Sequence, residues 1–309
     1  DEIKRELTIK PISLSDIGGD APPVYNYIET DKILNIPRFY GNNKFQEKNI
    51  KRSKSEEIKV NFNGKLREVQ EEPYDKLYNH IKENNTGIFS LATGQGKTVL
   101  SLKLVSDIKL KTLVISAGVN QVDLLNQWSE SIKKFMPKTT IGRLQGKTID
   151  YKDKDIILAT VSSLSSKEYE SEVFKGIGLV IIDECYHISS PTFSKCLFKI
   201  GGLKYILGVS ATPERPDGLT KVFKQWVGDI FYESKAIRKG LVPQVLMVKL
   251  RNSIHYKEHF ITCFGKENIC FVKMLSDLIE IQNRNKLIID LVEYYSKEKR
   301  TILVITDRV

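Results

Sequence analysis

The sequence predicts an α/β protein in which helices cover both faces of a parallel β-sheet. Short apolar runs alternate with stretches in which apolar residues recur three and four positions apart, the spacing of an amphipathic helix. Strands of a parallel sheet are buried on both faces and therefore read as continuous apolar runs. The runs are residues 87–91, 112–116, 155–160, 179–182 and 205–209, and the clearest helical patterns are residues 99–108 and 122–135.

Changes in composition and in the pattern of apolar residues divide the chain into three regions. Residues 1–60 are expected to form an N-terminal accessory domain with strand-like pieces at 6–9, 24–29 and 38–40, followed by a charged linker or long loop at 48–59. Residues 61–235 hold the apolar runs and form a first lobe. Residues 236–309 are expected to begin a second, truncated α/β lobe, with strands at 244–250 and 301–306 and helices at 274–281 and 286–295. Because the chain starts at Asp1, we expect a fragment or a processed product.

Composition excludes several classes of protein. Among 309 residues, 41% are apolar, which is typical of a globular protein and not of a disordered tail. The longest apolar runs are far shorter than the about 18 residues needed to cross a bilayer, so no membrane partner is expected. The net charge of +10 suits a nucleic acid but is also common on a solvated lysine-rich surface. Four cysteines without a CxxC pair favour a reduced compartment.

A phosphate-binding loop is predicted at residues 91–98, LATGQGKT, between an apolar run and a helical pattern. Gly94 and Gly96 allow a tight turn whose N–H groups face phosphate oxygens at a helix N-terminus. Lys97 would reach the terminal phosphates, and the Thr98 hydroxyl would hold Mg²⁺. Leu91 stands where the strict motif has its first glycine, so a plain glycine-rich turn is the alternative.

Two acids follow the apolar run 179–182. A buried carboxylate requires a partner, and a metal with a water supplies one. Asp183 can hold Mg²⁺, while Glu184 can deprotonate the water that attacks the γ-phosphate. The alternative is a pair of carboxylates that simply face solvent.

Two further elements fit the same site. Ser210 and Thr212, in GVSATPERPDG, suit a hydrogen-bonded relay from a nucleotide site, although SAT alone is a weak signal. Gln70 offers a donor and an acceptor together, which matches an adenine edge; a solvent-facing glutamine at the start of a helix is the alternative.

In this order, LREVQ, ATGQGKT, IIDECYH and SATPERPDG resemble the superfamily 2 helicases. The similarity is greatest to the branch that holds XPB-like repair helicases, phage branch-migration helicases such as UvsW, and DNA helicases of large cytoplasmic DNA viruses, including asfarviruses. It covers roughly residues 60–309. PRFYG, at residues 37–41, is weakly similar to the N-terminal region of the viral members.

The resemblance implies two RecA-like lobes, with ATP and Mg²⁺ in the cleft between them and nucleic acid across both. Adenine would be read by Arg67 and Gln70, and the phosphates would be held by Thr93, Gly94, Gln95, Gly96, Lys97 and Thr98. Asp183 and Thr98 would bind the metal, and Lys97, Asp183 and Glu184 would carry catalysis. The residues that couple ATP hydrolysis to movement would be Tyr186, His187, Ser210, Ala211 and Thr212. The residues that contact nucleic acid would be Gln127, Trp128 and Thr160. Residues 303–308 would open the second lobe.

The sequence departs from the family pattern where Tyr186 replaces the usual histidine and His187 follows one position later. The second-lobe motifs that carry an arginine finger are also missing, so we expect the chain by itself to bind ATP but to hydrolyse it slowly.

The interpretation is an ATP-dependent helicase or translocase acting on branched or partly duplex DNA, located in the cytoplasm, in a viral factory if viral, or in the nucleus. An RNA helicase, a non-catalytic platform that binds ATP and nucleic acid, and a P-loop kinase are the alternatives.

Overall fold

A computed structural model describes residues 1–12, 22–46, 51–190, 192–212, 214–234, 248, 258–263, 266–298 and 301–304. The chain divides into two compact units. The first comprises residues 1–14 and 20–237, and the second comprises residues 15–19 and 238–309. No helix in the described ranges is long and apolar enough to cross a membrane.

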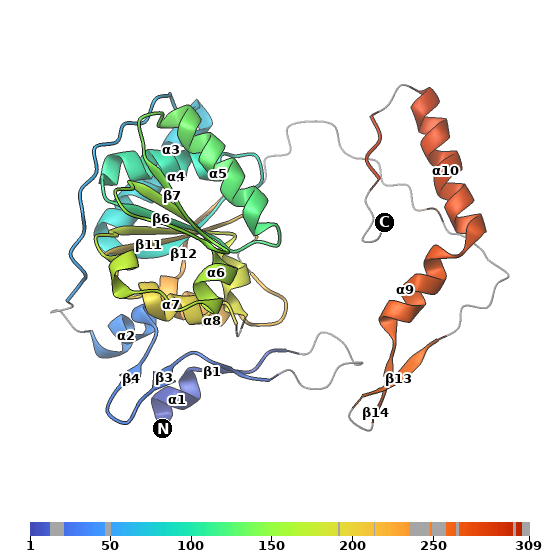
Figure 1. Ribbon diagram of the computed structural model, residues 1–309, viewed down its shortest axis with the longest axis horizontal. Coiled ribbons are helices and arrows are strands. Elements are labelled where there is room, and N and C mark those ends of the chain that lie inside the picture. The colour runs from blue at the N-terminus through green and yellow to red at the C-terminus, as the bar shows by residue number, and fades with distance from the viewer. Residues whose placement is uncertain are drawn as a thin grey trace. The chain divides into compact units, whose positions relative to one another are not determined.

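The first unit is built on an eight-stranded sheet with the order β12-β5-β11-β10-β6-β9-β7-β8 (Figure 1). Neighbouring strands are parallel except β8, which pairs antiparallel with β7. This confirms the predicted α/β fold. The five predicted runs correspond to β5 (Thr86–Ser90), β6 (Thr112–Ser116), β9 (Ile156–Thr160), β10 (Leu179–Asp183) and β11 (Tyr205–Ser210), and the strands that were not predicted are β7 (Ile141–Gln145), β8 (Thr148–Asp150) and β12 (Ile230–Glu233).

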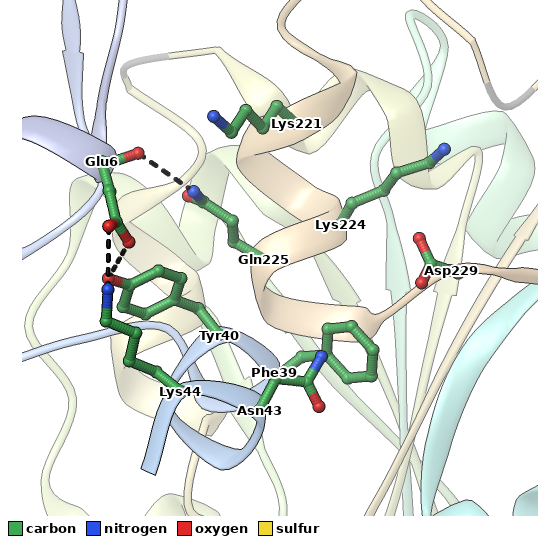
Figure 2. Close-up of a pocket in the computed structure, with 9 residues that line it drawn as sticks. All are labelled: Glu6, Phe39, Tyr40, Asn43, Lys44, Lys221, Lys224, Gln225 and Asp229. Atoms are coloured by element: carbon green, nitrogen blue, oxygen red, sulfur yellow. Dashed lines mark hydrogen bonds and ion pairs between the residues drawn. The ribbon is translucent and has the colours of Figure 1, made fainter. Parts of the chain in front are cut away.

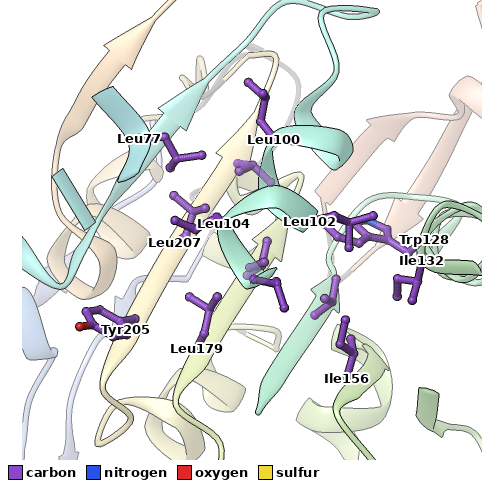
Figure 3. Packing of buried hydrophobic residues seen from close by; sticks show 14 of the residues in the cluster. Leu77, Leu100, Leu102, Leu104, Trp128, Ile132, Ile156, Leu179, Tyr205 and Leu207 are labelled. Carbon is purple, nitrogen blue, oxygen red and sulfur yellow. The ribbon is translucent and has the colours of Figure 1, made fainter. Parts of the chain in front are cut away.

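Helices cover both faces of the sheet. One layer holds α3 (Glu68–Asn84), α4 (Lys97–Ile108) and α5 (Gln121–Phe135), and the other holds α6 (Val161–Ser166), α7 (Lys195–Ile200) and α8 (Thr220–Val227). Alternate side chains of each strand enter different cores: in β10, Ile181 packs under the first layer and Ile182 under the second. Figure 3 shows part of the first core, where residues of α4 and α5, among them Leu102 and Trp128, pack over the strands.

Several short elements lie outside the two helical layers. The 3₁₀ turns η1 (Ser171–Phe174) and η2 (Cys185–Ser189) precede and follow β10. The N-terminal part of the chain contains α1 (Glu2–Glu6), α2 (Arg38–Phe45), a pairing of β1 (Thr8–Ile9) with β2 (Val24–Tyr25), and a pairing of β3 (Ile28–Glu29) with β4 (Leu34–Asn35).

The predicted strand at residues 38–40 is wrong, because these residues begin helix α2. Tertiary contacts override the local β-propensity there. The Arg38 guanidinium is buried and donates to the carbonyl oxygens of Leu203 and, at 2.8 Å, Lys204, in the turn before β11. Phe39 lies against Gly228, at the end of α8. Helix α2 thus packs directly on the first lobe. That the N-terminal part of the chain is a domain of its own stays a prediction.

A cavity of about 590 Å³ lies between α1, α2 and α8 (Figure 2). The Glu6 carboxylate accepts hydrogen bonds from Lys44 Nζ at 2.8 Å and Tyr40 Oη at 2.5 Å. These two bonds, that of Lys44 first, lower the pKa of Glu6 to about 2. The Gln225 amide, on α8, donates to the Glu6 carbonyl at 3.3 Å. Hydrogen bonds around the cavity therefore connect the N-terminal segment with α8, whose Gln225 comes 219 residues after Glu6 in the sequence.

The charged stretch at 48–59 is described from residue 51 and is an extended segment fixed to the lobe. Backbone hydrogen bonds join Ser53 to Gly202, and Glu56 to Gly176 and Lys111. The apolar side chains of Ile58 and Val60 are buried in the first core. The described part is an extended loop, and its course is determined by backbone pairing with the segments that precede β6 and β10.

The described part of the second unit contains a hairpin of β13 (Phe260–Cys263) and β14 (Lys266–Ile269), then α9 (Phe271–Ile279) and α10 (Gln282–Lys297). The two helices confirm those predicted at 274–281 and 286–295. Residues 301–304 form no strand, contrary to the prediction for 301–306, because they pair with no neighbouring backbone among the described residues. The remainder of that run, and the strand predicted at 244–250 apart from Val248, lie outside the described residues. A second RecA-like lobe stays a prediction.

Candidate nucleotide site

The parallel register brings polar residues together at the carboxyl edge of the sheet. Asp183 ends β10 opposite Ser116 of β6, and Ser210 ends β11 opposite Ser90 of β5. Ligands of open α/β sheets bind at this edge, where loops leave the strands. The motif residues thus meet because each directly follows a buried strand.

The predicted phosphate loop connects β5 with α4. Gly94 and Gly96 have φ of +81° and +94°, a region that residues with a Cβ rarely adopt. Gly96 is the N-cap of α4, so Lys97 and Thr98 begin the helix and free N–H groups face the loop. Thr93 and Gly94 are exposed, and Gln95 is held by a hydrogen bond from the hydroxyl of Ser234. The loop thus has the backbone geometry that an anion requires.

Lys97 and Glu184 meet across the site. Lys97 Nζ lies 3.4 Å from Glu184 Oε1, and the other carboxylate oxygen accepts a bond of 3.2 Å from Ser210 Oγ. Glu184 itself has φ 51° and ψ 50°, the left-handed region, which is uncommon for a residue with a side chain and frequent at functional sites. Ser210 also accepts a bond from Thr212 N at 3.1 Å. The structure thereby joins the predicted loop, acid pair and SAT element.

Asp183 is 6% exposed and has two hydrogen-bond donors. Trp128 Nε1 donates to its Oδ2 at 2.8 Å, and Glu184 N donates to its Oδ1 at 3.1 Å. Burial raises the pKa of Asp183, and the Trp128 hydrogen bond opposes that rise. Each oxygen retains a lone pair, so Asp183 fits a ligand of a hydrated Mg²⁺. Thr98, next to Lys97 in the first turn of α4, would supply a hydroxyl ligand.

Gln70 lies against the phosphate loop. Its Oε1 accepts from Arg67 N at 3.0 Å, and its Nε2 donates to the Gln95 carbonyl at 2.9 Å. A Cβ on Gly96 would lie only 2.2 Å from Nε2, so any side chain at that position would displace the Gln70 amide. One amide hydrogen and one lone pair of Gln70 remain for a base edge.

A cavity of about 470 Å³ opens beside Gln70, and Arg67, Leu91 and Tyr232 also line it. Its size and mixed lining suit a nucleotide base. The sequence analysis did not predict Tyr232 and Ser234 as lining residues. Tyr232 lies in β12 and Ser234 directly after it, and no strand was predicted there.

The residues predicted to couple the site to movement form a connected group. The rings of Tyr186 and His187, in η2, lie 4.1 Å apart between centroids. Burial, and then the positive charge of Arg215, lower the pKa of His187. Arg215, which the prediction did not include, donates to the Tyr186 carbonyl at 3.3 Å and pairs with Asp217. It thereby ties the SAT loop, with Ala211 and Thr212, to the residues after Glu184.

The nucleic-acid contacts predicted for Trp128 and Thr160 are not supported by their positions. Trp128 is 1% exposed and bonded to Asp183, because it lies on the apolar face of α5 with Leu125 and Ile132. Thr160 is buried and accepts from Ser163 N, capping α6. Gln127 is exposed on α5, as its predicted role requires.

A groove of about 530 Å³ lies at the same sheet edge as Thr160. It is lined by the loop before α5 and the first turn of α5, which includes Asp123, by the β7–β8 turn and by the start of α6. Gln121 Oε1 accepts from Ser162 N at 3.1 Å and from its hydroxyl at 2.9 Å across this groove. Backbone and hydroxyl groups of this kind are typical contacts for phosphates.

Comparison with known proteins shows which family the nucleotide-site region resembles. Residues 63–215 match the family described as type III restriction enzyme, res subunit. This stretch, just under half of the chain, is therefore similar to that family, and its viral and archaeal relatives are named helicases or translocases. The matched range contains the phosphate loop, the acid pair and the SAT element described above. The parallel sheet with a helical layer on each face is the RecA-like arrangement that the resemblance implied.

Curated relatives of the chain include viral and archaeal proteins. The chain is 29% identical to the putative ATP-dependent RNA helicase L396 of Acanthamoeba polyphaga mimivirus, over 99% of this chain and 59% of that protein. It is 35% identical to the DNA 3'-5' translocase XPB2 of Sulfurisphaera tokodaii, over 49% of this chain and 32% of that protein. The UvsW helicase of bacteriophage T4 superimposes with a TM-score of 0.49 and 15% identity, covering 75% of this chain and 92% of that one. The chain thus spans about three fifths of the mimivirus protein.

Proposed function

We propose that this chain is part of an ATP-dependent helicase or translocase that acts on DNA, with branched or partly duplex DNA as its substrate. The observation that carries the proposal is the meeting of Lys97, Glu184 and Ser210 beside the Gly96 turn and the Asp183 carboxylate. This arrangement places a phosphate-binding cation, a proton acceptor and a metal-binding carboxylate at one end of the sheet. The P-loop kinase alternative leaves the SAT element without a role.

Each group has a defined task in ATP hydrolysis. The Gly94–Gly96 turn and the start of α4 bind phosphate oxygens, and Lys97 neutralises their charge. A phosphate at this place competes with Glu184 for the Lys97 ammonium, which leaves the carboxylate able to orient water and accept its proton. Thr98 and Asp183 would hold Mg²⁺, which neutralises charge on the phosphate oxygens when it is bound.

Base recognition is proposed for the cavity beside Gln70. Both polar atoms of its amide already bond to the chain, so the side chain is fixed before a base arrives. Fixed donors and acceptors discriminate better than mobile ones because a mismatched base leaves them unpaired. This supports ATP as the nucleotide.

The polar groove near Gln121 and Ser162 is proposed to hold the nucleic-acid backbone. The lining offers N–H and hydroxyl groups from loops and from the first turns of α5 and α6, groups that contact phosphates and not base edges, which favours binding independent of sequence. An RNA substrate is the second candidate, because the mimivirus protein that matches 99% of this chain is named a putative RNA helicase. The DNA proposal draws on the archaeal relative, which is named a DNA translocase.

The test is ATPase activity of a protein that includes the complete second lobe, measured with single-stranded DNA, duplex DNA and RNA at one salt concentration. Stimulation by DNA well above that by RNA is expected, and the reverse order would assign the chain to RNA. The Glu184→Gln variant controls for contaminating ATPases. Lack of stimulation by any nucleic acid would favour the non-catalytic platform.

The location is a further proposal. Buried, unpaired Cys185 and Cys196 suit a reducing compartment, and viral relatives suit the host cytoplasm or a viral factory, with the nucleus as the alternative. Microscopy of a tagged chain in infected cells tests it.

A further inference from the structure

The indole of Trp128 occupies an unexpected position for a residue on the helix that the resemblance assigns to nucleic-acid contact. Its N–H donates to Asp183 Oδ2 at 2.8 Å, and both side chains are almost fully buried. The second carboxylate oxygen accepts from Glu184 N at 3.1 Å. One N–H group on each oxygen fixes both the position and the plane of the carboxylate.

The position of the indole is determined by core packing. Leu125 and Ile132 lie on the same face of α5 and are fully buried, so the ring cannot move without disturbing the first core. Figure 3 shows Ile132 beside Trp128. At its N-terminus, α5 is also held through the Gln121 bonds to Ser162. The Trp128 N–H is therefore a rigid donor.

We propose that Trp128 is a positioning residue for the Mg²⁺ ligand Asp183. It touches neither nucleotide nor metal; it holds the carboxylate in the orientation that the hydrated metal requires. The proposal rests on the proposed function, since it presumes that Asp183 binds Mg²⁺. Hydrogen-bond partners of metal ligands typically contribute about 10–100-fold to metal affinity.

The chain contains a matched control. It has two tryptophans, and the other, Trp226, is also buried and donates its indole N–H at 2.8 Å, but to Asn26 Oδ1 beneath the opposite face of the sheet. Trp128→Phe and Trp226→Phe therefore remove the same N–H from an equally deep ring. Only the former change removes a bond to the proposed metal ligand.

The first experiment measures binding of a non-hydrolysable ATP analogue to the whole chain by calorimetry, at a series of Mg²⁺ concentrations and in EDTA. Trp128→Phe is expected to raise the Mg²⁺ concentration for half-maximal enhancement of binding by about tenfold or more. It should leave analogue affinity in EDTA unchanged within about twofold. Trp226→Phe should change neither quantity.

Tryptophan fluorescence provides a second measurement that does not require the Trp128→Phe variant to fold. In Trp226→Phe, Trp128 is the only emitting indole, and Mg²⁺ with the analogue should change its emission with the same midpoint as in calorimetry. A constant emission at saturation would overturn the proposal.

The two proposals fail differently. If the unaltered chain binds no Mg²⁺-analogue, the proposed nucleotide site is wrong. If it binds and the Mg²⁺ midpoint of folded Trp128→Phe equals that of the unaltered chain, Trp128 has only a packing role and the positioning proposal is overturned.

Discussion

Among the single residues of the site, Lys97 lies between two negative groups. One is the Glu184 carboxylate, 3.4 Å from its Nζ, and the other is the phosphate group expected at the Gly96 turn. Lys97→Ala should abolish most ATP binding, because backbone amides alone leave much phosphate charge unpaired. Calorimetry with Mg²⁺-ATP measures this. Lys103→Ala is the control, since Lys103 lies on the same helix but pairs with Asp107. Equal affinity of Lys97→Ala and the unaltered chain would disprove the phosphate site.

Glu184 can be tested separately from binding. Glu184→Gln should keep ATP affinity and reduce hydrolysis by at least about a hundredfold in a protein with both lobes, because an amide preserves shape but cannot accept the proton. Steady-state ATPase and calorimetry measure the two properties. Glu172→Gln, which alters an exposed pair with Lys175, is the control. Turnover within about threefold of the unaltered protein would require another base.

Much of the site could be predicted because its residues are adjacent to buried strands in sequence. Lys97, Asp183 and Ser210 each follow such a run, and the structure brings them together at one edge. The burial of Trp128 follows from helical periodicity, which places it on the same face of α5 as Leu125, whereas the resemblance implied contact with nucleic acid. Tyr232 could not be predicted, since its position depends on the pairing of β12 with β5 far earlier in the chain.

At the scale of elements, the N-terminal segment is anchored to α8 by a buried amide. Asn26 is fully buried; its Nδ2 donates to the Val222 carbonyl at 3.0 Å and to Gln225 Oε1 at 2.6 Å, and its Oδ1 accepts from Trp226. Asn26→Ala should lower the free energy of unfolding by on the order of 3 kcal/mol, because several buried polar groups lose their partners. Urea unfolding measures this.

The exposed Asn35 supplies the comparison for that experiment. Its amide donates to the Ile28 carbonyl at 3.4 Å on the surface, so Asn35→Ala should change stability by less than about 0.5 kcal/mol. Equal effects of the two substitutions would show that the Asn26 network does not stabilise the fold.

The elements differ in how far local sequence determines them. The strands β5, β6, β9, β10 and β11 were predictable because continuous apolar runs have few alternatives in a parallel sheet. The hairpin of β7 and β8 was missed although residues alternate in burial along β7 and Gly146 adopts φ +54° at the turn. Helix α2 was mistaken for a strand because the contacts that stabilise it, those of Arg38 and Phe39, lie far along the chain.

On the scale of the whole molecule, the charge of +10 has a measurable consequence. Nucleic-acid affinity should fall steeply as salt rises, with log K linear in log salt concentration, because binding releases counterions from phosphates. Fluorescence anisotropy with two unrelated sequences at several salt concentrations tests this. The two sequences should give nearly equal affinities, and a preference above about a hundredfold at fixed salt would reveal direct base recognition.

The left-handed backbone of Glu184 has a consequence for protein engineering. A residue with a side chain is about 1–2 kcal/mol less favourable there than glycine. The fold would thus be more stable with a residue that cannot accept a proton, so heat resistance and turnover make opposite demands on this position. Variants selected for thermostability alone would drift toward inactive chains here, and any such selection needs a parallel screen for ATP turnover.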